Sequence, residues 1–147
     1  MNVSAAIISG AMSGITLKGK LYMIEQEKAF KGEDVVRFLK HLMHLMRRIP
    51  GKLLVIWDGS PIHRSRAIKD FLANGAARRL QLEQLPGYAL DLNPDEGIWR
   101  HLKCVEMKNL CCQSLAELKV ELRKAKERLR HKKQVILGCI RQPGFEV

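Results

Sequence analysis

Two acidic residues of this sequence, Asp58 and Glu96, stand where carboxylates can do chemistry. Asp58 follows five consecutive apolar residues, 53–57, and precedes a Gly-Ser-Pro turn. A short apolar run between turn residues is typical of a strand buried on both faces, and open α/β sheets bind ligands just beyond the carboxyl ends of their strands. Asp58 is therefore either a site residue or, in the plainer interpretation, the cap of the turn that follows it.

Glu96 falls in the first turn of a helix that Asn93 is expected to cap and Pro94 to begin. Helical spacing places Arg100 and Lys103 on the same face, at i+4 and i+7. One interpretation is a helix-start acid paired with Arg100, which contributes only about 0.3–0.5 kcal/mol. The other is a metal ligand, because hard cations such as Mg²⁺ prefer oxygen donors. Two such ions about 3.5–4 Å apart can drive phosphodiester chemistry.

The rest of the chain predicts one α/β domain over residues 1–147, with a mixed sheet flanked by helices. Residues 1–10 show little beyond small and apolar side chains. Strands are expected at 13–17, 21–25, 52–57 and 79–86, and helices at about 33–48, 64–74, 93–109 and 114–133. The first two strands would form a hairpin turned by the Lys-Gly-Lys sequence at 18–20, and the helices would cross over between parallel strands. The helix at 114–133 has an apolar stripe and a strongly basic opposite face.

The balance of charge points to a polyanionic partner. Lys and Arg number 26 against 15 Asp and Glu, a net charge of +11. A domain this basic favours nucleic acid as its partner, although a merely soluble basic protein is the alternative. The apolar runs are far shorter than the roughly 20 residues of a membrane span, and the start lacks the basic region of a secretory signal. We therefore expect a cytoplasmic location. Candidate nucleic-acid contacts are His63, Arg64, Lys69, Arg78, Arg79, Arg100 and Lys103.

Three other residue types have both structural and functional interpretations. For His63, a loop hydrogen bond or phosphate contact is favoured over a catalytic role. Trp57 and Trp99 are expected in the core beneath the site, and stacking of Trp99 on a base is the less favoured alternative. The four cysteines (104, 111, 112 and 139) are expected as partly buried free thiols. A zinc site using His101, Cys104 and Cys111 is the less favoured alternative, because the adjacent pair at 111–112 fits one tetrahedral site poorly.

Several segments resemble a known family. The sequences WDGSPIHRS (57–65) and LPGYALDLNPDEGIWRHLK (85–103) are similar to the second half of the DDE endonuclease domain of mariner-like bacterial insertion-sequence transposases. The segments SGITLKGKLYM and AFKGEDVVRFLKHL are also similar, so the resemblance runs from about residue 11 to at least residue 112. It implies an RNase H-like fold. It also implies Mg²⁺- or Mn²⁺-dependent cleavage of DNA at transposon ends and joining of the freed 3′ hydroxyl to target DNA.

In the resemblance, Asp58 matches the second catalytic acid and Glu96 the third, both as ligands of a two-ion site. Gly59 stands where the family often has Asn. Asp95 stands where an apolar residue is commoner, and as a neighbour along a helix it should point about 100° away from Glu96. The family's first catalytic Asp lies on a strand before the hairpin, yet residues 1–10 contain no acid. The family's DNA-binding helix-turn-helix has no counterpart either.

These departures predict an N-terminally truncated transposase that lacks the first strand and has an incomplete metal site. Its cleavage and strand-transfer activity should be impaired. An uncovered sheet edge would favour a homo-oligomer or association with an intact transposase. The alternative function is a non-enzymatic DNA-binding or oligomerising remnant.

Overall fold

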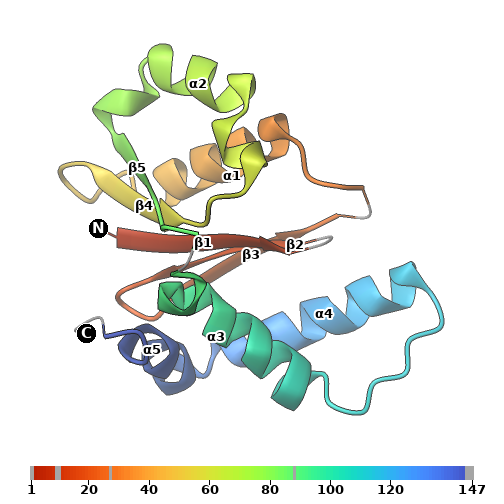
Figure 1. Ribbon diagram of the computed structural model, residues 1–147. Coiled ribbons are helices and arrows are strands. Elements are labelled where there is room, and N and C mark those ends of the chain that lie inside the picture. The colour runs from red at the N-terminus through yellow and green to blue at the C-terminus, as the bar shows by residue number, and fades with distance from the viewer. Residues whose placement is uncertain (1, 9–10, 27, 88, 145–147) are drawn as a thin grey trace.

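The computed structural model describes residues 2–8, 11–26, 28–87 and 89–144. Within these residues lie five strands and five α-helices, and Figure 1 shows their arrangement. The strands are β1 (Asn2–Ile8), β2 (Ala11–Thr16), β3 (Leu21–Glu25), β4 (Leu53–Trp57) and β5 (Leu80–Gln84). The helices are α1 (Gly32–Leu45), α2 (Arg66–Ala73), α3 (Pro94–His101), α4 (Leu115–Arg130) and α5 (Lys133–Arg141).

The strands form one mixed sheet in the order β3-β2-β1-β4-β5. The pairs β1–β2 and β2–β3 are antiparallel, whereas β1–β4 and β4–β5 are parallel. Helices α1 and α2 cover one face of the sheet, and α3, α4 and α5 cover the other (Figure 1). The mixed sheet, its hairpin and its flanking helices are as expected from the sequence.

The expectation that the first strand is missing is wrong. β1 occupies the centre of the sheet, paired with β2 from Val3↔Thr16 to Ile8↔Ala11 and with β4 from Asn2↔Leu54 to Ala5↔Trp57. Its sequence, NVSAAII, has too little alternation to be recognised as a strand. A central strand is defined by the partners on either side of it, and these outweigh its weak local propensity. The edges of the sheet are β3 and β5.

Each face of the sheet has its own apolar core. Beneath α1 and α2, Phe38, Leu42 and Ile68 pack with Val55 and Trp57 of β4. The α1 residues in this core recur at helical spacing, which gives the helix one apolar face. The second core lies beneath α3, α4 and α5 and includes Ile15, Ile98, Trp99, Leu102, Leu129 and Ile136. Both tryptophans are buried, as expected, with 4% of Trp57 and 5% of Trp99 exposed.

The helical region after residue 93 differs from the expected pattern. α3 ends at His101 and continues as a wide π-helical turn, η4 (Leu102–Glu106). In it the Met107 N–H donates to the Leu102 carbonyl, five residues back, at 2.8 Å. α5 was not predicted at all. Its contact with the β2–β3 turn, where Leu137 packs against Gly19, depends on residues far apart in the sequence.

Candidate active site

Asp58 lies directly after β4, at the carboxyl end of a central parallel strand. Its Oδ1 accepts a 3.0 Å hydrogen bond from the Ser60 backbone N–H, which is the turn-capping role considered for it. The same oxygen lies 3.0 Å from Nε2 of His63. Oδ2 takes part in neither contact. Capping and site roles are therefore compatible, because they use different oxygens of one carboxylate.

His63 is the residue that shapes the surroundings of Asp58. It belongs to a short 3₁₀ helix, η1 (Pro61–Arg64), and is buried with 6% of its surface exposed. Its ring stacks on that of Trp57, with centroids 3.9 Å apart and planes 10° from parallel. The sequence favoured a loop hydrogen bond or a phosphate contact for His63. Its 3.0 Å contact with Asp58 of the same loop agrees with the first of these roles, and the phosphate contact stays a prediction.

These contacts set the ionisation of Asp58. The nearby His63 ring is the main influence and lowers the pKa of the Asp58 carboxyl. Partial burial acts in the opposite direction, and the Ser60 N–H lowers the pKa further. The pKa of Asp58 is therefore below its ordinary value of 3.8, and the carboxylate is charged at neutral pH. A charged, partly exposed carboxylate at a strand end is suited to binding a cation.

The start of α3 positions the two neighbouring acids differently. Asn93 caps the helix by accepting a 3.1 Å hydrogen bond from the Asp95 N–H. Asp95 is fully buried, and its Oδ1 accepts a 3.0 Å hydrogen bond from the Ser13 hydroxyl of β2. Glu96 is only half-buried. The separation of roles expected for successive helical residues is thus present: Asp95 anchors the helix, and Glu96 remains open to solvent.

Helix α3 packs against β1 and β2, and β1 is also the strand that pairs with β4. Glu96 and Asp58 are therefore carried by elements that share β1 as a neighbour. Four of the six basic candidates divide between the two layers, and all four are exposed. Arg64 in η1 and Lys69 in α2 lie on the α1–α2 side, whereas Arg100 in α3 and Lys103 in η4 lie on the other.

The donor set for metal ions is limited. Among the residues that the structure describes, no group of three or more His, Cys, Asp or Glu side chains could hold an ion. Asp58 and Glu96 offer oxygen donors of the kind Mg²⁺ prefers, but the described residues do not complete a two-ion site. Cys104 and Cys111 are exposed free thiols, and Cys112 and Cys139 are partly buried free thiols.

The basic face of α4 is largely occupied by contacts within the domain. Glu25 at the end of β3 is bound by Arg123 at 2.9 Å and Lys126 at 3.6 Å. Glu106 in η4 is bound by Arg128 at 2.9 Å and by Lys132, which lies between α4 and α5. These two carboxylates lie against α4 as its counter-charges, a role that their positions in the sequence do not reveal. Much of the positive charge of α4 therefore holds the helix to the sheet and to η4.

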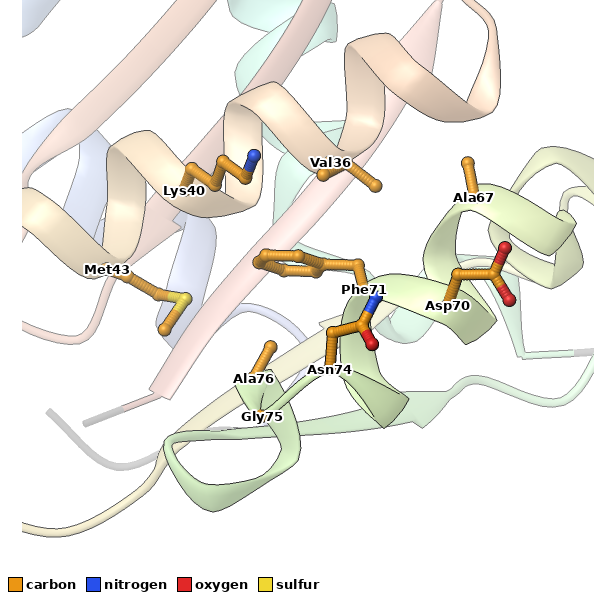
Figure 2. Close-up of a pocket in the computed structure, with 9 residues that line it drawn as sticks. All are labelled: Val36, Lys40, Met43, Ala67, Asp70, Phe71, Asn74, Gly75 and Ala76. Atoms are coloured by element: carbon orange, nitrogen blue, oxygen red, sulfur yellow. The ribbon is translucent and has the colours of Figure 1, made fainter.

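A separate groove lies between α1 and α2 (Figure 2). Val36, Lys40 and Met43 line it from α1, and Phe71 lines it from α2. The Lys40 ammonium lies 5.7 Å from the centre of the Phe71 ring. None of the predicted site residues lines this groove, so it is distinct from the Asp58 region.

Fold and sequence comparisons together define the class. The β3-β2-β1-β4-β5 sheet with helices on both faces is the RNase H-like fold of transposase catalytic domains. The chain belongs to the DDE superfamily endonuclease family, which matches residues 9–119. No curated protein sequence matches the chain. In the described residues, no helix has both the length and the apolar character needed to cross a membrane.

Solved structures of Mos1 mariner transposase have the same fold. Its catalytic domain is 15% identical and has a TM-score of 0.61, with 99% of this chain and 83% of that chain covered. The Mos1 catalytic domain with raltegravir and Mn is 17% identical, with a TM-score of 0.59 and coverage of 99% and 84%. A pre-cleavage Mos1 transpososome is 15% identical, with a TM-score of 0.61 and coverage of 93% and 44%. At these identities, the likeness establishes the fold.

Proposed function

We propose that this chain is a transposase catalytic domain that acts on DNA but is impaired in strand cleavage and strand transfer when alone. The observation that carries the proposal is the composition of β1. Ala5 of β1 is paired with Trp57 in the parallel ladder. The next residues along the two chains, Ala6 and Asp58, are therefore level with each other. No residue of β1, from 2 to 8, has a carboxylate. The strand beside Asp58 therefore supplies no acid to a shared metal site.

Asp58 and Glu96 are the proposed metal ligands. The pKa of Asp58 is lowered, so its carboxylate is charged at neutral pH, and its Oδ2 is not involved in the contacts with Ser60 and His63. Two carboxylates carry less ligand charge than three, and Mg²⁺ retains its water readily when ligands are few. We therefore expect weak binding of Mg²⁺ or Mn²⁺ and little assistance to phosphodiester chemistry.

DNA is the proposed partner, as transposon ends and target. The net charge of +11 and the exposed basic side chains on both layers favour a polyanion. Structures of Mos1 include a paired-end complex and a strand transfer complex, and this chain has the fold of their catalytic domain. Contact mainly with backbone phosphates would make the affinity strongly dependent on salt and would place the protein with the nucleoid.

A nicking assay with Mn²⁺ and a calorimetric Mn²⁺ titration test the proposal. Wild type should nick DNA weakly or not at all, and Asp58→Asn and Glu96→Gln should each remove the weak Mn²⁺ binding. Ala6→Asp would place a carboxylate beside Asp58 and should strengthen Mn²⁺ binding. Ala5→Asp is its matched control, because successive strand residues face opposite sides of the sheet. Robust nicking by wild type that Asp58→Asn abolishes would refute the impairment.

The second candidate is a non-enzymatic remnant that binds DNA or another transposase copy. It is favoured by the absence, within the described part of the chain, of a three-residue cluster able to hold a metal. The calorimetric titration separates the two candidates. The non-enzymatic function is supported if neither wild type nor Ala6→Asp binds Mn²⁺ while the chain still binds DNA or self-associates. In that case Asp58 and Glu96 do not form a metal site.

A further inference from the structure

A cluster of cations lies at the end of the sheet opposite to Asp58. It consists of Arg47, Arg48, Lys52, Arg78 and Arg79, and is called here the basic edge. The first two follow the end of α1, Lys52 precedes β4, and the last two precede β5. All are exposed except Arg79, which is partly buried. Within the described part of the chain, none of the five forms an ion pair, whereas most cations of α4 are paired with acids.

Backbone and side-chain hydrogen bonds hold the segments of the basic edge together. In the parallel pair β4–β5, Leu53 is level with Leu80, so Lys52 and Arg79 enter the sheet side by side. The Leu53 N–H donates to the Arg79 carbonyl at 2.7 Å. The Arg79 guanidinium donates in turn to the Met46 carbonyl at 2.5 Å, which ties the end of α1 to the start of β5. Three separate segments thus place their cations on one part of the surface.

No acid offsets these charges along the segments that carry them. The sequence has no Asp or Glu from residue 35 to 57 or from residue 71 to 82. Asp70, which lines the neighbouring groove of Figure 2, is 3.8 Å from Arg66. The surface is also open, because a Cβ added at Gly51 or Gly75 would meet nothing within 4 Å. An open group of five like charges is costly to the folded state unless a polyanion is bound.

We infer that the basic edge is a second DNA-binding surface, which takes the phosphate backbone of a duplex segment separate from any DNA at Asp58. The inference rests on the proposed function in that it takes DNA as the polyanion. Lys52 and Asp58 are six residues apart along one extended strand, so they lie roughly 20 Å apart at about 3.3 Å per residue. This exceeds the Debye length of about 8–10 Å in ordinary buffers, so the two ends act independently.

Arginine predominates in the edge, and its planar guanidinium binds phosphate oxygens through two parallel hydrogen bonds. An anionic membrane would require a broader apolar face beside the cations. Within the described residues, Leu45 is the exposed large hydrophobic residue adjoining the edge, at 41% exposure. The surface therefore fits a nucleic-acid backbone better than a lipid headgroup layer.

The test compares two triple variants in binding to a labelled short DNA duplex over a range of salt concentrations. The variant R47Q/R48Q/R78Q removes three exposed cations of the edge and leaves Arg79, with its bond to Met46, intact. The control K108Q/K133Q/R141Q removes the same charge from the exposed surface of the α3–α5 layer. Thermal unfolding of both variants confirms that each is folded.

The edge variant should lose at least tenfold in affinity. Its plot of log affinity against log salt should be shallower by about 2–3, at about 0.9 per phosphate contact. The control should change the slope by less than one. Equal effects of the two variants, a wild-type slope in the edge variant, or no binding of duplex by wild type would overturn the inference. The inference would also be overturned if the edge variant lost binding to phosphatidylserine vesicles but bound DNA as well as wild type does.

Mn²⁺ titration of Asp58 and Glu96 variants is a separate readout, so the metal proposal can fail or stand independently.

Discussion

The hydroxyl of Ser13 donates a 3.0 Å hydrogen bond to Oδ1 of Asp95, and both side chains are fully buried. The bond joins the middle of β2 to the first turn of α3 across 82 residues of sequence. Asp95 adjoins Glu96, so the same bond fixes the helix start that carries the proposed metal ligand. A buried polar group needs such partners, since desolvation without them is costly.

Ser13→Ala should destabilise the protein by about 1–3 kcal/mol, because it takes a hydrogen bond from a buried carboxylate. Urea denaturation measures the change. Ser65→Ala is the matched control, since it removes the same atom from a buried hydroxyl that has no hydrogen-bond partner among the described residues. That variant should be neutral or slightly more stable. Equal losses in the two variants would mean that the Ser13–Asp95 bond adds nothing beyond packing.

Glu106 should make the fold sensitive to acid. Burial opposes its ionised form, but hydrogen bonds from Lys132, Arg128 and His101 outweigh this and lower the pKa of Glu106 from 4.5 to about 2. A carboxylate with a depressed pKa stabilises the fold above its unfolded pKa, and this stabilisation is lost as the pH falls through the folded pKa. The free energy of unfolding should therefore decline between about pH 5 and pH 2.

Glu106→Gln should lower stability by about 1–3 kcal/mol at neutral pH and flatten this acid dependence, as followed by denaturation at several pH values. Glu127→Gln provides the comparison, because Glu127 forms an exposed pair with Arg130. Exposed pairs contribute at most about 1 kcal/mol, so its acid profile should resemble that of wild type. An unchanged profile in Glu106→Gln would show that other carboxylates control the acid transition.

His63→Ala should have two effects. Loss of the ring stacked on Trp57 should cost about 2–3 kcal/mol, of which about 0.5–1.5 comes from the ring pair itself. The pKa of Asp58 should also move up toward its ordinary value, because its main stabilising neighbour is gone. Carboxyl NMR titration measures the second effect. His41→Ala, at an exposed position on α1, should leave both the stability and the Asp58 pKa unchanged. If His63→Ala does not change the pKa of Asp58, His63 is not the main cause of its lowered value.

Two glycines in helices should respond in opposite directions to alanine. At Gly32, the first residue of α1, a Cβ would lie 2.2 Å from Oγ of Ser65 and 2.9 Å from its Cβ. Gly32→Ala should therefore destabilise. At Gly138 in α5, a Cβ would meet nothing within 4 Å, and alanine should stabilise by about 0.5–1 kcal/mol through its helix propensity. If the melting temperatures of the two variants change in the same direction, the space around each glycine does not decide the effect of alanine.

The sequence was informative wherever a local pattern was strong. The apolar run before Asp58, the hairpin and the stripe of α1 all gave elements that the structure contains. Ser114 and Glu117 form side-chain hydrogen bonds at the start of α4. The Ser114 hydroxyl accepts from the Glu117 N–H at 3.1 Å, and the Glu117 carboxylate accepts from the Gln113 N–H at 2.9 Å.

What could not be predicted depends on residues distant in the chain. β1 has a weak local pattern and is a strand because β2 and β4 pair with it. The internal position of His63 follows from the Trp57 ring beneath it, and spacing alone left a phosphate contact open. The sequence shows the basic face of α4 but not its counter-charges, because Glu25 and Glu106 lie in other elements. The pairing of Asp58 with Glu96 remains a prediction.

The wide turn at Leu102–Glu106 makes chain length a determinant of how the C-terminal helices lie. Removing one residue from it would leave an ordinary helical turn and rotate everything beyond by about 100° around the axis of α3. Glu106 would then face away from Arg128 and Lys132. Single-residue deletions here should be far more damaging than substitutions, so among relatives this segment should vary in residue type and keep its length.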